Sequence, residues 1–508
     1  MLHGIRFFVA GSDGVRGFSP SLLSDGEPSI PNLLKMTPDS PSHLQRIWFV
    51  GFAGHRAVPD RAAAKAAIAR ELGTILGTVS GELVGISSAA AGADLLFLDA
   101  CREAGLRTVV LLPFPKERFA QDFDDPAEWE HACRCMDEAW WCEVSPGGEE
   151  SPAAYHVVAR ESLEVADRML FLWNGKPARG LGGTAETVRE AKDREIPSRI
   201  IDAETLQATW NGKEPELNAV DPDFDDLPAS TDIEDLFDQL DKRAVQGAPR
   251  SRYFAAGSMS VNHLATILQA LLVAFVIMSP ESGAMLKLVM ITCAALLPWI
   301  GSRLRWQERW IRDRVRAELL RSLLYSHEPG SPLRPPAVEL FGRDAPFLRT
   351  AALHLVKKRR GWENARDAYM AERIDGQIGY LKSKGTLAGN RMAIFGRVFW
   401  FASWGAMIVG AYVVITAFLH KTHEAPWKGS LELTSAALPG IAAWCLAMIS
   451  VFEFKRRASL YRQLVEELQR LRPRMAAAGC ASAVSTAMNQ IERLLLNELW
   501  EWQGSRKK

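Results

Sequence analysis

Three short stretches of small and polar residues in the N-terminal half carry the side chains best suited to chemistry. They contain Gly54, His55 and Arg56; then Ser87, Ser88, Gly92 and Asp94; then Asn174, Gly180, Gly182, Gly183, Thr184 and Glu186. Small residues let a ligand approach the backbone, and exposed N–H groups at the start of a helix attract anions, above all phosphate. Arg56 would add a charge-assisted hydrogen bond to such a phosphate, and Asp94 or Glu186 would accept hydrogen bonds from ribose hydroxyls. These residues predict the binding of a nucleotide.

Each stretch follows an apolar run that is typical of a buried strand. The runs are 47–50, 83–86 and 169–173, with others at 108–112, 139–144 and 196–201. Helical patterns separate the runs, at 60–78, 94–104, 127–137, 153–166 and 184–194. Apolar strands that alternate with amphipathic helices predict an α/β domain with a parallel, Rossmann-like sheet covered on both faces. Ligands of such sheets bind outside the carboxyl ends of the strands, where the three stretches lie.

Each stretch taken alone has a plainer explanation. A glycine-rich turn between a strand and a helix is often only a tight turn. By itself, His55 is more typical of a turn or core histidine than of an acid–base group. Three such turns at corresponding strand ends nevertheless favour one shared binding site, so we predict a nucleotide-type ligand and no resident cofactor.

Residues 130–142 contain several potential metal ligands. They are Glu130, His131, Cys133, Cys135 and Cys142. The Cys-x-Cys spacing differs from the usual gap of a zinc knuckle, no second pair follows, and the neighbouring tryptophans favour packing. The pattern therefore predicts buried thiols and no metal site. The chain has seven cysteines, an odd number, and no export signal, so we also expect no disulfide framework.

The order of these motifs resembles the SLOG superfamily, a Rossmann-like group that includes DNA-processing protein A and the LOG phosphoribohydrolases. The similarity covers roughly 45–202 and is carried by Gly-His-Arg at 54–56, Ser-x-Ala-Ala-Gly-Ala-Asp-x-Leu at 88–96, Leu-Pro-Phe-Pro-x-x-x-Phe at 112–119 and Gly-Gly-Thr-x-Glu-x-x-x-Glu-Ala at 182–191. The resemblance implies that the three loops bind a nucleotide or a nucleotide-derived messenger.

The hydrolases of this superfamily carry Pro-Gly-Gly-x-Gly-Thr-x-Glu-Glu. Residues 179–187 keep the Gly-Thr-x-Glu core but lack the proline, the second glycine and the second glutamate. The loss of one of the paired carboxylates shifts the expectation from hydrolysis towards sensing. If the protein is an enzyme, the resemblance implies a nucleotide N-glycosidase that uses Glu186 and Arg56.

The overall composition is an average over two different halves of the chain, one polar and one with long apolar runs. Among 508 residues, 60 Lys and Arg balance 60 Asp and Glu, which argues against a nucleic-acid binder that works through bulk positive charge. Residues 1–44 are rich in Ser, Pro and Gly and predict a flexible N-terminal extension. Residues 206–252 are dense in acid and predict a solvated linker with one amphipathic helix, which could pack on basic segments further along the chain.

Beyond the acidic linker, four apolar segments have membrane length. They are Ala255–Met278, Met285–Gly301, Ile394–Phe418 and Leu433–Phe452, and each meets or approaches the roughly 20 residues that a spanning helix needs. Arginine and lysine flank one end of each segment, and the loops at the opposite ends are short and carry few charges. By the positive-inside rule, the spans form two hairpins with both termini in the cytoplasm. Two buried hairpins in a soluble protein are the alternative.

The membrane half of the chain, over roughly 250–500, resembles the SLATT domains, transmembrane effectors that associate with SLOG and nucleotidyltransferase sensors in bacterial conflict systems. The resemblance is carried by Tyr369-x-x-x-Arg373-Ile374-x-x-Gln377-Ile378-x-Tyr380-Leu381-x-x-Lys384, by Asn390, and by Phe454-x-x-Arg457-x-x-x-Tyr461. It implies an effector that forms a pore or disrupts the membrane.

Together these patterns predict an α/β Rossmann-like domain joined to an all-α membrane domain with four transmembrane helices and cytoplasmic helical extensions. We expect a nucleotide-binding domain at 45–205, a first hairpin with a cytoplasmic helix at 253–326, and a second cytoplasmic helix near 347–388, the second hairpin and C-terminal helices within 327–508. The expected protein is a homo-oligomer of the bacterial cytoplasmic membrane that senses a nucleotide-type signal and perturbs the lipid bilayer in antiphage defence. A membrane-tethered N-glycosidase or phosphoribohydrolase and a non-catalytic scaffold are the alternatives.

Overall fold

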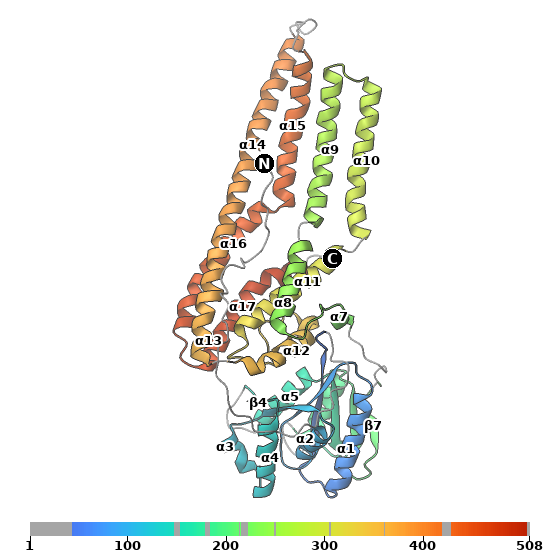
Figure 1. Cartoon of the computed structure of the whole chain (residues 1–508), viewed down its shortest axis with the longest axis vertical. Coiled ribbons are helices and arrows are strands. Elements are labelled where there is room, and N and C mark those ends of the chain that lie inside the picture. Colours follow the sequence, from blue (N-terminus) through green and yellow to red (C-terminus); the bar gives the residue numbers. More distant parts are fainter. Residues whose placement is uncertain are drawn as a thin grey trace, which may run out of the picture. The chain divides into compact units, whose positions relative to one another are not determined.

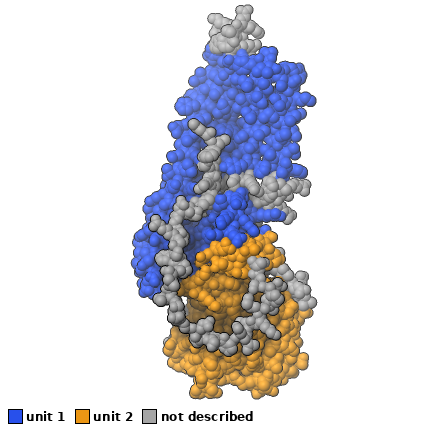
Figure 2. Space-filling model, viewed as in Figure 1, with its two compact units in different colours: residues 1–35, 237–329, 360–508 blue, residues 36–236, 330–359 orange. Residues whose placement is uncertain are grey.

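The chain forms a parallel-dominated sheet with alternating helices, followed by a helical region (Figure 1). This computed structural model describes residues 43–146, 153–177, 183–212, 214, 222–247, 250–303, 306–359, 361–418 and 428–504. These residues divide into two compact units, coloured separately in Figure 2. The sheet unit contains the described residues up to 236 together with 330–359, and the helical unit contains those of 237–329 and 360–504. The predicted extension at 1–44 lies almost entirely outside the described residues.

The sheet has seven strands in the order β4-β3-β2-β1-β5-β6-β7. They are β1 (Ile47–Gly54), β2 (Glu82–Ser87), β3 (Arg107–Leu112), β4 (Trp141–Val144), β5 (Arg168–Trp173), β6 (Ser198–Asp202) and β7 (Ala208–Trp210). The first six are parallel, and β7 pairs antiparallel with β6. The chain runs outward from β1 as far as β4 and then returns to the other side of β1 with β5. The strand order therefore reverses between β1 and β5, which is where open α/β sheets bind ligands.

Helices follow the strands and cover both faces of the sheet. They are α1 (Arg61–Leu76), α2 (Ala93–Glu103), α3 (Lys116–Phe119) with the 3₁₀ turn η1 (Ala120–Asp122), α4 (Pro126–Glu138), α5 (Ala153–Val165) and α6 (Thr184–Asp193). Val50 and Leu83 pack with Phe97 of α2 on one face, whereas Phe49 packs with Val158 of α5 on the other. Successive side chains of a strand point to opposite faces, so a sheet covered on both sides requires the uninterrupted apolar runs seen in the sequence.

A segment from much later in the chain completes the second of these cores. Residues 330–359, which include α12 (Ala345–Leu355), contribute the fully buried side chains of Leu333 and Leu353. The backbone N–H of Ile47 in β1 donates a hydrogen bond to Oγ1 of Thr350 at 3.1 Å. The helix expected over 347–388 is accordingly divided: α12 ends at Leu355 and packs with the sheet, and α13 (Trp362–Ala368) begins the next helical stretch in the helical unit.

The described part of the helical unit consists mainly of long helices. They are α8 (Ile233–Gly247), which begins in the sheet unit, α9 (Arg250–Ala274), α10 (Pro280–Arg303), α11 (Trp306–Ser326), α13, a π-helical turn (Tyr369–Asp375), α14 (Gly376–Phe418), α15 (Lys428–Val451), α16 (Phe454–Ala476) and α17 (Ala481–Gly504). Here α9 packs against α10 and α15, and α15 packs against α14 (Figure 1).

Four helical stretches are long and apolar enough to cross a membrane. They are Tyr253–Ala274, Pro280–Ile300, Trp362–Phe418 and Gly429–Ala476, and each overlaps one predicted span. Their surfaces carry large exposed apolar side chains, among them Phe401 at 78% and Phe418 at 83% relative exposure. A soluble protein rarely exposes so many large apolar side chains along its helices, so these faces favour a membrane over the alternative of buried hairpins.

The acidic segment before the first span contributes an ordered helix, α8. Its apolar residues Leu240 and Ala244 are buried, which confirms the predicted amphipathic pattern. A carboxylate oxygen of Asp241 lies 2.8 Å from a guanidinium nitrogen of Arg321 and 3.5 Å from one of Arg314, both on α11. The expectation that the acidic segment packs on basic residues is therefore confirmed.

A buried ion pair lies in the core of the helical unit. The guanidinium of Arg373, in the π-helical turn, lies 2.7 Å from the carboxylate of Glu492 on α17, and the Tyr369 hydroxyl donates to the same carboxylate at 2.7 Å. All three side chains are at most 5% exposed. Arg373 and Tyr369 are among the residues that carry the resemblance to SLATT domains, and here they join the third helical stretch to the C-terminal helix.

Candidate functional site

Two glycines bring the first two predicted loops into close contact at the carboxyl ends of β1 and β2. Gly92, which caps α2, has φ +89°, and a Cβ at this position would lie 2.0 Å from the carbonyl oxygen of Arg56. A Cβ on Gly54 would lie 2.5 Å from that of Ala93. The Ala93 N–H also donates to the carbonyl oxygen of His55 at 3.1 Å. Only glycine permits this approach of the two backbones.

Asp94 fastens these two loops together. Its buried carboxylate accepts hydrogen bonds from the hydroxyls of Ser87 at 3.0 Å and Ser88 at 2.6 Å, and from the backbone of Gly54 and Ala90. Burial raises the pKa of the carboxyl group, although these hydrogen bonds act in the opposite direction. With these donors around a buried carboxylate, Asp94 holds the loops in place, so we assign it this role instead of the ribose contact that the sequence suggested.

The third loop is joined to the first through His55. The backbone N–H of Asn174 donates to Nε2 of His55 at 3.1 Å, so the neutral imidazole carries its proton on Nδ1. The hydroxyl of Thr184 donates to the carbonyl oxygen of Gly54 at 3.1 Å. Gly183 caps the N-terminus of α6, whereas Gly180 and Gly182 lie outside the described residues. The structure thus gathers the described parts of all three loops around the reversal of strand order.

Arg56 reaches from the first loop to residues that the sequence analysis did not assign to the site. Its guanidinium donates to the Tyr155 hydroxyl and to the backbone carbonyl of Asp122, both at 3.2 Å. The Tyr155 hydroxyl and Arg118 both donate to the carboxylate of Asp122. Burial alone would raise the pKa of Asp122, but these donors hold it below its usual value, and burial together with the Asp122 contact raises the pKa of Tyr155 to about 12.

Glu186 lies on the first turn of α6 beside α5. Its carboxylate is 3.7 Å from Nδ1 of His156 and 3.9 Å from the guanidinium of Arg189. His156 follows Tyr155 directly, so the first turn of α5 contacts both Arg56 and Glu186. The arrangement places a cation and a helix N-terminus that suit phosphate near a carboxylate and an imidazole that suit hydroxyl groups or proton transfer.

The potential metal ligands of 130–142 do not form one cluster. Glu130 pairs with Arg134 at 3.1 Å, and the other four separate into two groups. His131 and Cys135 lie beside Asp99 of α2, and the ligand atoms of these three lie within 4.8 Å of one another. Cys133 and Cys142 instead lie near the Lys116 ammonium, and burial raises the pKa of both thiols. The cysteines in the described residues are free thiols.

No family model matches the chain, and no curated protein matches it. The resemblances to the SLOG superfamily and to the SLATT domains therefore stay predictions that rest on the motifs quoted above.

Proposed function

We propose that the protein is a membrane effector whose sheet unit binds a nucleotide-derived signal and whose four spanning helices respond by forming a pore or disrupting the bilayer. A role in antiphage defence follows from the resemblance to bacterial conflict systems. The signal would bind where β1 and β5 diverge, between the loop that carries Arg56 and the N-terminus of α6. Both termini would lie in the cytoplasm, and several copies would assemble in a bacterial cytoplasmic membrane.

We base the binding half of this proposal on how the loops are built. Contacts of Gly92, Asp94 and His55 fix the loops, and the guanidinium of Arg56 stays exposed although it donates to Tyr155 and Asp122. The three loops are fixed to one another where the strand order reverses, so they form a preorganised surface for a ligand. Loops that were only tight turns would not need these contacts with one another.

The path of the chain supports coupling between binding and the membrane. Residues 330–359 follow the first hairpin and α11, enter the core of the sheet unit, and then lead into α13 and the second hairpin. Leu333 and Leu353 in this segment pack with β1 to β3 through Phe49, Val84 and Val109. A ligand that favours one arrangement of the sheet unit would thereby act on the segment that joins the hairpins, as a population shift.

Two substitutions test the proposal in cells. We expect Arg56→Ala to remove the cation and Gly183→Asp to place a negative charge at the start of α6, so both abolish ligand binding and toxicity. Membrane fractionation should show unchanged insertion for both variants. Arg61→Ala is the matched control, because Arg61 is also exposed but pairs with Glu128 on α4. Normal toxicity of the Arg56 and Gly183 variants would exclude the proposed site.

A second candidate function, cleavage of a nucleotide N-glycosidic bond, is favoured by the contact between Glu186 and His156. The 3.7 Å separation of their side chains could provide an acid–base pair in place of the second glutamate that the sequence lacks. Incubation of the full chain with nucleotides, followed by chromatography of released base, tests this function. Base release that Glu186→Gln abolishes would identify an enzyme, and a chain that neither cleaves nor is stabilised by any nucleotide would fit the scaffold.

A further inference from the structure

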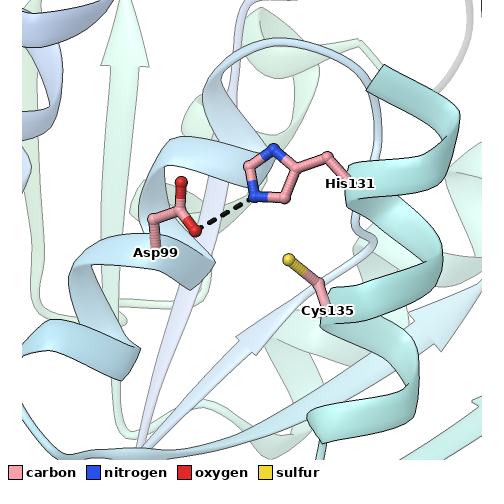
Figure 3. A group of neighbouring side chains, drawn as sticks. All are labelled: Asp99, His131 and Cys135. Carbon is pink, nitrogen blue, oxygen red and sulfur yellow. Dashed lines mark hydrogen bonds and ion pairs between the residues drawn. The ribbon is translucent and has the colours of Figure 1, made fainter. Parts of the chain in front are cut away.

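Three side chains converge on one point of the sheet unit outside the nucleotide-type site. They are Asp99 of α2 and His131 and Cys135 of α4 (Figure 3). His131 and Cys135 are four residues apart, so they lie one above the other on the face of α4 that meets α2. Nε2 of His131 is 3.0 Å from Oδ1 of Asp99, and the ligand atoms of all three residues lie within 4.8 Å of one another.

These separations are close to those of a first coordination shell. With bonds of 2.0–2.3 Å, a tetrahedral Zn²⁺ site places neighbouring ligand atoms roughly 3.3–3.8 Å apart. The histidine–aspartate separation of 3.0 Å is slightly shorter than this range, and the sulfur of Cys135 needs to approach by at most about 1 Å. A side-chain rotation supplies such a movement without a change in either helix.

The donor set selects the class of ion. One thiolate, one imidazole and one carboxylate suit Zn²⁺, whereas Mg²⁺ and Ca²⁺ require oxygen ligands. We propose that Asp99, His131 and Cys135 form a binding site for Zn²⁺ or a similar thiophilic divalent cation, with water in the fourth position. Cys135 coordinates as the thiolate, and its proton passes to the solvent when the ion binds.

The surroundings of the cluster leave an entry path and hold one ligand in place. The side chains of His131 and Asp99 are 18% and 13% exposed, whereas Cys135 is buried. Arg102 donates to Oδ1 of Asp99 at 2.6 Å and to Glu138 at 3.3 Å, which holds the carboxylate beside His131. Ligating carboxylates in proteins are commonly held by such outer hydrogen bonds.

The ion would tie α4 to α2. The first turn of α2 carries Asp94, which holds the two loops described above, so the cation would brace the helix from which that carboxylate projects. This inference does not rest on the proposed function, because none of the three ligands belongs to the nucleotide-type site. Metal binding and nucleotide binding can also be measured separately. The alternative is a hydrogen-bonded Asp99–His131 pair that lies beside an inert thiol.

Cobalt substitution tests the site on the full chain, purified in detergent without a polyhistidine tag and stripped with a chelator. Co²⁺ replaces Zn²⁺ and reports both thiolate coordination, through near-ultraviolet charge transfer, and tetrahedral geometry, through visible absorption. We expect saturation at one Co²⁺ per chain and displacement by Zn²⁺. Cys133→Ser is the matched control, because Cys133 lies on the same helix within two residues of Cys135 but outside the cluster.

The variants decide the outcome. Cys135→Ser should lose the charge-transfer band, His131→Gln should weaken Zn²⁺ binding at least about 10-fold against a chromophoric competitor, and Cys133→Ser should match the wild type. Asp99→Asn supplies a further variant if one of these does not fold, as judged by metal-free melting. The absence of charge transfer in the wild type, or a signal that Cys135→Ser retains, would overturn the proposal.

Discussion

Substitution of Gly92 by alanine is the sharpest available test of how the candidate site is built. The residue caps α2 with φ +89° and ψ −119°, a backbone conformation that is essentially restricted to glycine. A Cβ here would also lie 2.0 Å from the carbonyl oxygen of Arg56, so the loop before α1 must move away. The variant should therefore lose both stability and the position of Arg56.

The size of the stability loss can be estimated by comparing the two glycines that flank α2. Gly105, just beyond the other end of α2, also has a positive φ (+69°), but a Cβ there meets no atom within 4 Å. Gly105→Ala should cost about 1 kcal/mol, the strain of a left-handed residue alone. Gly92→Ala adds a more strained conformation and a backbone clash, and we expect a loss of at least about 3 kcal/mol. At about 2–4 °C per kcal/mol for a unit of this size, the melting temperature should fall by roughly 6–12 °C for Gly92→Ala and by roughly 2–4 °C for Gly105→Ala.

Thermal unfolding of the full chain in detergent measures the two variants, and hydrogen exchange over residues 88–103 assigns the loss to this region. Ligand-free protein is sufficient, so the result does not depend on the identity of the signal. Equal losses for Gly92→Ala and Gly105→Ala would refute the reasoning, because the contact between the two loops would then contribute nothing.

Three further predictions concern other parts of the chain. Leu353→Ala should destabilise the sheet unit by about 2–5 kcal/mol in chemical denaturation, because the deleted side chain is fully buried against β1 and β2; an unchanged midpoint would contradict the packing of α12. Ultraviolet titration should show the Tyr155 hydroxyl ionising near pH 12, and Tyr155→Phe should lack this step. Because the pKa is raised from 10.0 in the folded protein, the contribution of Tyr155 to folding stability is complete below pH 10 and is lost as the pH rises to about 12. Glu492→Gln should cost about 3–5 kcal/mol, because Arg373 is left buried without its counter-ion, and melting of the full chain measures the loss.

The sequence predicted the sheet and the spanning helices because their signals are local. Strands such as 47–50 are apolar runs of a few residues, and the spans are apolar runs long enough to cross a membrane. The short strand β7 lies in the polar segment read as linker, where three residues carry no periodicity. The packing of α12 on the sheet could not be predicted either, because Leu333 and Leu353 contact residues that are far away in the sequence.

The candidate site was predictable in position but not in the role of each side chain. Glycine-rich turns marked the loops, yet the number of donors around Asp94 depends on how two loops meet in space. Tyr155 and His156 could have been found from topology, because the first turn of a helix that follows a parallel strand lies at the carboxyl edge of the sheet. The spacing of His131 and Cys135 is visible in the sequence, but the third ligand, Asp99, comes from another helix.

The most direct test of the sensor–effector account is dye release from liposomes that contain the full chain. Cyclic mononucleotides, cyclic dinucleotides and ADP-ribose are first screened for those that raise its melting temperature, and each is then added to the liposomes. The account predicts that a nucleotide that stabilises the wild type also triggers dye release, and that Arg56→Ala abolishes both effects while Arg61→Ala abolishes neither. A nucleotide that binds and stabilises the chain through Arg56 without any change in membrane permeability would contradict it.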